Sequence, residues 1–295
     1  MSGVVKLPVQ VRVGGRPGCG RRTVARALRG AGVAIADASE PADLDVYVLT
    51  ETLKPEDRRA LAESPRPVVA VLNKADLAGF GGPGPLAAAA AHCGRLGDLT
   101  GVPFFPLAGL AAVAATDDTV IDDDLVDALR ALITDPADLG STDGFAATSH
   151  RLPAATRQRL LVRLDLFGIA HGVLALRAGA DRAGLRAALR RASGVDGLLA
   201  GIDAAAAPVR YQRLAADEAV DTRMAAAVAV IRAAGLEVDD VDDDASASAH
   251  LWRAITWQRY SRGPVSRLHR SCGADIVRGS LLLWERAGGV AEQLS

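Results

Sequence analysis

The sequence is short of several residue types that define particular classes of protein. Only three cysteines occur among its 295 residues, at the widely separated positions Cys19, Cys93 and Cys272. Thiols so few and so far apart argue against a disulfide-stapled secreted domain and against a structural zinc site. Aromatic residues make up only 4% of the chain. We therefore expect a core built mainly from alanine, leucine and valine.

Long apolar runs and an excess of charge of either sign are also missing. The most apolar stretch, 160–176, is interrupted by Arg163, Asp165 and His171, whereas a membrane-spanning helix needs about 20 apolar residues. The formal net charge is −1, which argues against nucleic acid or an anionic membrane as the partner. The first residues do not resemble a secretory signal. These absences predict a cytoplasmic protein without a transmembrane span.

The first half of the sequence alternates apolar runs with segments of helical spacing. Runs rich in β-branched residues favour strands, and periodic alanine and leucine favour helices. Such alternation is typical of an α/β fold, in which helices cover both faces of a parallel sheet. The expected strands cover 9–13, 33–36, 45–49, 67–72 and 102–107. The expected helices cover 22–29, 54–63, 86–92 and 123–134.

The character of the sequence changes after residues 135–153, where glycine, proline and serine gather. Beyond them strand patterns are rare and helical spacing dominates. The expected helices there cover 157–176, 181–192, 208–234, 249–262 and 265–284. We therefore predict two domains, an α/β domain over residues 1–140 and a mostly α-helical domain over residues 150–295.

A glycine-rich turn lies between the first expected strand and the first expected helix. Glycines let backbone N–H groups wrap around a phosphate, and the helix N-terminus adds unpaired donors and a positive dipole. The spacing of Gly15 and Gly20 fits the pattern G-x-x-x-x-G-K-[S/T], but the next two residues are arginines. The alternative is a turn that merely joins strand to helix. The candidate phosphate contacts are Gly15, Gly18, Gly20, Arg21, Arg22 and Thr23.

The expected strand at 67–72 runs directly into Asn73-Lys74-Ala75-Asp76. Here the sequence resembles the GTPase branch of the P-loop NTPases, particularly its translation-factor-like and Era-like members. The resemblance implies that Asp76 accepts two hydrogen bonds from guanine, that the Lys74 stem lies over the base, and that Asn73 ties this loop to the glycine turn. A carboxylate suits this task because adenine lacks the matching two-donor edge. The alternative is a polar turn after a strand.

The resemblance covers residues 9–134, under half of the chain. It implies a P-loop NTPase-like sheet. It also implies that the loop at Ala108-Gly109 donates a backbone N–H to the guanine carbonyl.

Several of the residues that carry out catalysis in the family are replaced or missing in this chain. Arg21 and Arg22 replace the Lys that reaches the phosphates and the Ser or Thr that binds Mg²⁺. Asp37 is the candidate Mg²⁺ ligand, but Glu40 then stands where the family has a glycine near the γ-phosphate. A carboxylate repels that phosphate, and no Gln or His is visible to orient water. We therefore expect weakened binding of GTP or GDP, doubtful binding of Mg²⁺, and weak or absent hydrolysis.

These features predict a GTPase-like regulatory or scaffold protein, either nucleotide-dependent or nucleotide-free, whose helical domain contacts a partner protein. One alternative is a slow, active GTPase that needs a partner. Another is an interaction module that binds membrane or nucleic acid through the arginines and aromatic residues of 252–286. We favour an amphipathic helical pair for that segment, with arginine stems covering apolar surface. The segment from Asp165 to His171 is distinctive, but the sequence assigns no chemistry to it. We expect His171 to be a core or interface residue.

Overall fold

The structure, a computed structural model, describes residues 8–37, 39–79, 82–214, 218–239 and 245–290. Contacts between Cα atoms divide the chain into two compact units. One is formed by residues 9–202 and the other mainly by residues 203–295. Each unit is described by itself.

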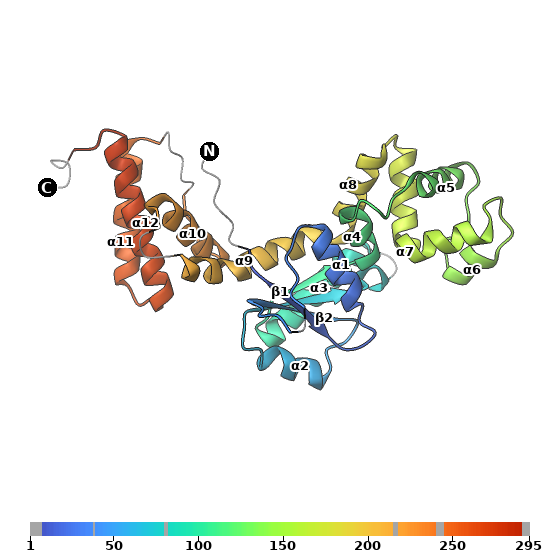
Figure 1. Cartoon of the computed structure of the whole chain (residues 1–295), viewed down its shortest axis with the longest axis horizontal. Helices are drawn as coiled ribbons and strands as arrows, with labels where there is room; N and C mark the ends of the chain where they lie inside the picture. Colours follow the sequence, from blue (N-terminus) through green and yellow to red (C-terminus); the bar gives the residue numbers. More distant parts are fainter. Residues whose placement is uncertain (1–7, 38, 80–81, 215–217, 240–244, 291–295) are drawn as a thin grey trace. The chain divides into compact units, whose positions relative to one another are not determined.

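A four-stranded parallel sheet forms the centre of the 9–202 unit (Figure 1). Its strands lie in the order β1-β2-β3-β4, and each is hydrogen-bonded to the next in sequence. The strands are β1 Val11–Gly15, β2 Leu44–Leu49, β3 Val68–Asn73 and β4 Phe104–Leu107. The strand expected at 33–36 is reduced to one parallel bridge between Ile35 and Val11. Because all four strands are parallel, the segments that follow them meet at one edge of the sheet.

Helices cover both faces of this sheet. Neighbouring residues of β3 point to opposite faces, and Val69, Ala70 and Val71 are all fully buried. Leu61 and Leu96 pack on one face from α2 and α3, and α1 and α4 pack together on the other side. The α/β prediction is thereby confirmed. These helices are α1 Arg21–Gly30, α2 Pro55–Ala62, α3 Pro85–Thr100 and α4 Gly109–Thr116.

Four further helices belong to the same unit as the sheet. They are α5 Asp123–Thr134, α6 Thr142–Ala147, α7 Ala154–Arg177 and α8 Arg182–Ser193. Helix α4 contacts α7 and α8, and α5 contacts α7.

The division between the two units differs from the boundary that composition predicts at 140–150. That region contains α6, and Phe145 within it is fully buried. The Phe145 carbonyl accepts a hydrogen bond from the buried Arg157 guanidinium. The two units meet in sequence between Ile202 and Asp203, inside α9 Val195–Arg213.

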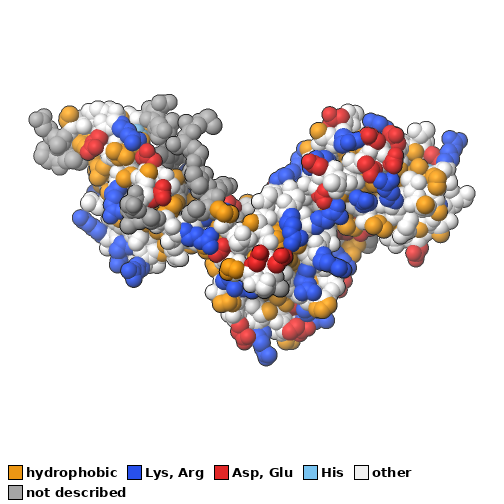
Figure 2. All heavy atoms as spheres, viewed as in Figure 1, with side chains coloured by type: hydrophobic (Ala, Val, Ile, Leu, Met, Phe, Trp, Pro, Cys, Tyr) orange, Lys and Arg blue, Asp and Glu red, His pale blue; other side chains and the backbone are white. Residues whose placement is uncertain are grey.

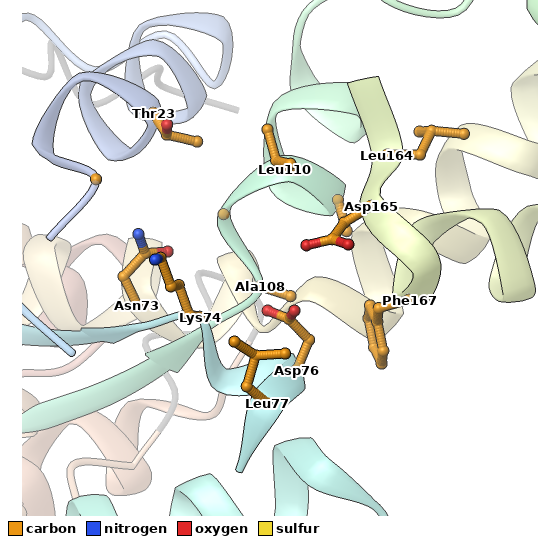
Figure 3. Close-up of a pocket in the computed structure, with 13 residues that line it drawn as sticks. Thr23, Asn73, Lys74, Asp76, Leu77, Ala108, Leu110, Leu164, Asp165 and Phe167 are labelled. Atoms are coloured by element: carbon orange, nitrogen blue, oxygen red, sulfur yellow. The ribbon is translucent and has the colours of Figure 1, made fainter. Parts of the chain in front are cut away.

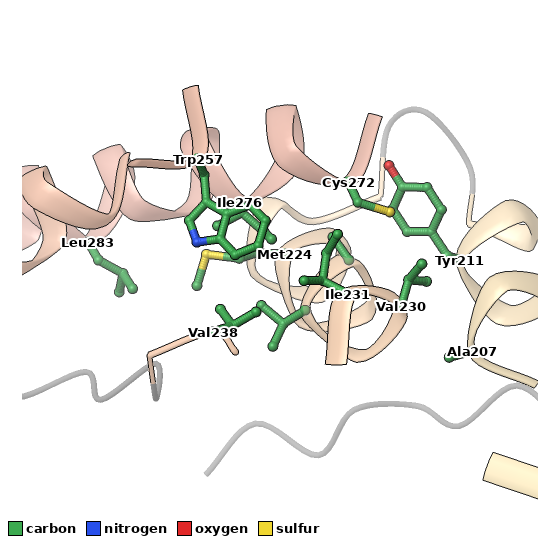
Figure 4. Packing of buried hydrophobic residues seen from close by; sticks show 12 residues of the cluster. Ala207, Tyr211, Met224, Val230, Ile231, Val238, Trp257, Cys272, Ile276 and Leu283 are labelled. Atoms are coloured by element: carbon green, nitrogen blue, oxygen red, sulfur yellow. The ribbon is translucent and has the colours of Figure 1, made fainter. Parts of the chain in front are cut away.

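Helices are the regular secondary structure of the second unit within the residues described. The single helix expected at 208–234 is instead the end of α9 followed by a separate α10, Val220–Ala233. Helices α11, Ala247–Arg262, and α12, Arg267–Arg286, complete the unit. Its core joins apolar side chains of α10, α11 and α12 (Figure 4). Most of the acidic run at 237–244 lies outside the described residues.

Trp257 belongs to this core, and Tyr260 packs against it. Trp257 and Trp284 are buried, whereas Trp252 is 65% exposed. The buried Asp275 carboxylate accepts hydrogen bonds from Arg278 of α12 and from Tyr211. Two of the three indoles are therefore buried and cannot stack on a base or enter a lipid layer. This packing fits the amphipathic helical pair.

Charge is mixed over the visible surface. Figure 2 shows basic and acidic side chains interspersed on that face, without a continuous basic patch. Within the part of the chain that the structure describes, no helix has the length and apolar character needed to span a membrane.

Candidate functional site

The glycine turn follows β1 and leads straight into α1. Gly15 has a φ of 132°, and a Cβ added there would lie 2.2 Å from the Val48 carbonyl oxygen. Gly20, the residue before α1, has a φ of 82°. A Cβ at Gly20 would lie 2.3 Å from Nδ2 of Asn73. Only glycine satisfies both the backbone conformation and the close approach at these two positions.

The loop after β3 lies directly against this turn. Asn73, at the end of β3, is 5% exposed, and its Nδ2 donates a hydrogen bond to the carbonyl oxygen of Cys19 at 2.9 Å. Lys74 adopts a left-handed conformation, with a φ of 60°. A short 3-10 helix, Ala75–Leu77, then carries Asp76. The contact that the resemblance implies for Asn73 is present.

These segments surround a cavity of about 230 Å³ (Figure 3). Gly20 and Thr23 contribute from the glycine turn and α1, and Asn73, Lys74 and Asp76 contribute from the loop after β3. The first turn of α4 and the middle of α7 complete the lining. All of these residues belong to the 9–202 unit.

Asp76 is a half-buried carboxylate in the wall of this cavity. Burial raises its pKa above the ordinary aspartate value, and the negative charge of Asp165 raises it further. A hydrogen bond from its own backbone N–H and the positive charge of Lys74 act in the opposite direction without cancelling the rise. The ionised carboxylate is therefore under-compensated, so a ligand that donates hydrogen bonds would stabilise it.

The backbone donors near the cavity differ from those implied by the resemblance. The Ala108 N–H already donates to the Ser193 carbonyl oxygen at 2.9 Å. Helix α4 begins at Gly109, and the first N–H groups of a helix have no acceptor within it. Gly109 and Leu110 line the cavity, so the backbone N–H groups without an acceptor inside their own helix belong here to the first turn of α4. Sequence reasoning did not identify this helix.

A second cavity, of about 850 Å³, lies along the glycine turn. It shares Gly20 and Thr23 with the first cavity, and Gly18 also lines it. Arg21 and Arg22 reach it as exposed side chains. A negatively charged group in this cavity would meet the N-terminus of α1 and two guanidinium groups.

Asp37, the predicted Mg²⁺ ligand, lines the same cavity and is exposed. Its backbone N–H donates to Oε2 of Glu40 at 2.9 Å, so Glu40 caps this turn. Among the residues described, no group of three or more His, Cys, Asp or Glu side chains is arranged to hold a metal ion. Magnesium binding at Asp37 stays a prediction.

Arg16 of the glycine turn pairs with Asp57 and is therefore not free to contact a phosphate. The buried Asp57 carboxylate accepts hydrogen bonds from Arg16 and from the Tyr47 hydroxyl, both at 2.8 Å, and from the Lys54 N–H. Burial by itself would raise the pKa of Asp57, but these hydrogen bonds lower it below the ordinary value. Asp57 thereby anchors the outer part of the turn to α2 and β2.

We expect Asp57→Ala to lower the free energy of unfolding by roughly 3 kcal/mol, because three donors would lose a buried, charged acceptor. Urea denaturation would measure the change. Asp127→Ala, which removes an exposed carboxylate paired with Arg130, should change stability by less than about 0.5 kcal/mol. Equal effects of the two substitutions would contradict the anchoring role.

Several residues of the cavity wall were given no role by the sequence, and two of them lie beside the break in α7. Asp165 and Phe167 of α7 reach the site, because α7 is interrupted at Asp165, where φ is 57°. The segment 165–171 is distinctive in the sequence, but the sequence does not show that the helix is interrupted there. His171 is half-buried, with its ring centroid 4.4 Å from that of Phe167. Burial lowers the pKa of His171, as suits the packing role expected for it.

We compared the chain with protein-family models, with curated proteins and with solved structures, and none of them matches it.

Proposed function

We propose that the 9–202 unit binds a guanine nucleotide, with the base in the cavity beside Asp76 and the phosphates along the glycine turn. The observation that carries this proposal is the hydrogen bond from Asn73 to Cys19, which joins the two loops. Around it, two cavities of different chemistry share Gly20 and Thr23. One offers a carboxylate and apolar walls, and the other offers backbone amides and guanidinium groups.

The base end suits guanine better than adenine. The N1–H and the exocyclic amine of guanine present two adjacent donors, which one carboxylate can accept together. Adenine presents a donor beside an acceptor on the corresponding edge, so one oxygen of Asp76 would face a lone pair. The first turn of α4 offers N–H groups to the guanine carbonyl. Both contacts select the same base.

The phosphate end supports binding better than hydrolysis. Arginine at positions 21 and 22 can pair with phosphate oxygens, but neither side chain supplies a hydroxyl for Mg²⁺. Thr23 is one position late for that role, and its methyl carbon lies 3.2 Å from where a Cβ on Gly109 would be. Phosphoryl transfer depends on accurate placement of the metal and of the attacking water. Hydrolysis is accordingly weak or absent, and the protein acts as a regulator or scaffold through a partner protein.

Titration of the purified full chain with fluorescent analogues of GDP and ADP, with and without Mg²⁺, tests the proposal. The expected result is binding of the GDP analogue at least tenfold tighter than that of the ADP analogue. Equal affinities, or no binding of either analogue, would remove the guanine assignment.

One observation favours a second candidate, a slow GTPase. Asp37 lines the same cavity as the glycine turn, where a carboxylate could hold Mg²⁺ beside phosphates. Phosphate release from GTP that is lost in Asp37→Ala would support this activity. Absence of GTP turnover at millimolar Mg²⁺ would exclude the GTPase activity and leave nucleotide binding as the function.

A further inference from the structure

Helix α7 is broken in the middle by one residue with an unusual backbone. Asp165 has φ 57° and ψ 173°, a backbone conformation that residues other than glycine rarely adopt. Such backbones persist where the surrounding structure requires them, often at binding sites. One carboxylate oxygen of Asp165 accepts a hydrogen bond from the Leu166 N–H at 2.7 Å, at the point where the helix resumes. The other oxygen remains available to a ligand.

The break turns the Asp165 side chain into the cavity that contains Asp76. In Figure 3 the two carboxylates point toward one another, and Phe167 forms the adjoining wall. The negative charge of Asp165 contributes to the raised pKa of Asp76. Like charges that face one another across a cavity oppose folding, so the arrangement calls for a ligand with several hydrogen-bond donors.

A third acceptor in the cavity wall, Oδ1 of Asn73, lacks a donor. Asn73 is 5% exposed, and its Oδ1 has no hydrogen-bond partner among the residues that the structure describes. A buried acceptor without a donor carries an energetic cost, and ligands are one way to remove it. This observation is independent of the two carboxylates and indicates the same kind of ligand.

We propose that Asp165 is a second base-reading residue, supplied by the helical segment, which accepts the amine hydrogen of guanine that Asp76 leaves unpaired. This inference rests on the proposed function. Guanine carries three N–H hydrogens on N1 and its exocyclic amine, and a single carboxylate accepts two of them. Hypoxanthine lacks the amine, and xanthine places a carbonyl oxygen there, which two carboxylates repel. The cavity therefore selects a purine with an amino group at C2.

Calorimetric titration of the full chain with GDP, IDP and XDP tests this assignment. Asp165→Asn is the suitable variant, because asparagine tolerates a positive φ and retains an oxygen for the Leu166 N–H. We expect the variant to bind GDP about tenfold more weakly and IDP unchanged, so that the preference for GDP over IDP falls tenfold. XDP should bind more tightly than to the unmodified chain.

Asp181→Asn is the matched control. Asp181 also caps a helix, through the Gly184 N–H, but it does not line the cavity. The GDP-to-IDP ratio of this variant should equal that of the unmodified chain.

Several results would overturn the assignment. An equal loss of GDP and IDP affinity in Asp165→Asn would show a purely structural role, and equal tightening would show that Asp165 only repels. Binding of Mn²⁺ alone that is lost in Asp165→Asn would indicate a cation site instead. If the unmodified chain bound none of the three nucleotides, the proposed function would fail as well, whereas GDP binding with an unchanged ratio would remove only the role of Asp165.

Discussion

Asp76→Asn should lower the affinity for GDP by about 100-fold and leave the affinity for ADP unchanged. The substitution replaces one acceptor oxygen with an amide N–H₂, which would face a donor of guanine. A site built on hydrogen bonds to a base discriminates strongly when one of them becomes a donor–donor contact. A 100-fold loss corresponds to about 2.7 kcal/mol. Calorimetric titration with both nucleotides measures the change, and Asp98→Asn, an exposed position on α3, is the control.

The same substitution should raise the stability of the free protein, which separates loss of binding from misfolding. The pKa of Asp76 is raised in the folded protein, so its ionisation favours the unfolded chain. This destabilisation is present above the folded pKa and disappears as the pH falls below the ordinary aspartate value. At pH 7 we expect the melting temperature of Asp76→Asn to rise by about 1–3 °C, and at pH 3 the gain should vanish. A lower melting temperature at pH 7 would mean that Asp76 is structural.

Gly20→Ala should break the contact between the glycine turn and the loop after β3. Alanine there would adopt a φ of 82° and place its Cβ 2.3 Å from Nδ2 of Asn73. We expect the free energy of unfolding to fall by roughly 3 kcal/mol, and GDP binding to be lost with the contact between the two loops. Gly32→Ala is the matched control, because Gly32 has a φ of 84° and open space around it. It should cost only about 1 kcal/mol.

A double-mutant cycle sharpens this test. Asn73→Ala removes the side chain that the new Cβ would strike, so Gly20→Ala should cost less in that background. The expected coupling is about 1–2 kcal/mol, measured by urea denaturation of the four proteins. Additive costs would mean that the two residues do not touch in solution.

The sequence predicted the parts of the site that depend on strands. Continuous apolar runs fixed the strand that ends at Asn73, and the parallel arrangement then brings this residue to the same sheet edge as Gly20. Helix α4 was missed because all of its residues except Leu110 are buried, so it has no polar face and shows no helical period.

The remaining differences arise where local composition does not report long-range packing. The break at Asp165 cannot be predicted, because aspartate is common inside and outside helices and its backbone angle depends on the cavity it faces. Residues 135–153 have the composition of a linker because helix caps use the same residues as loops. Ser141, for example, accepts a hydrogen bond from the Gly144 N–H at the start of α6.

The three cysteines provide a built-in reporter of how the molecule opens. All are buried and unpaired, and burial raises the pKa of Cys93 to about 12 and that of Cys272 to about 11, which suppresses the reactive thiolate of those two. Cys19 lies in the glycine turn, and its carbonyl is the one that Asn73 holds. An alkylating reagent should therefore modify the native protein only as fast as each thiol is transiently uncovered. Nucleotide that clamps the turn would slow the labelling of Cys19 while leaving that of Cys272, in the other unit, unchanged.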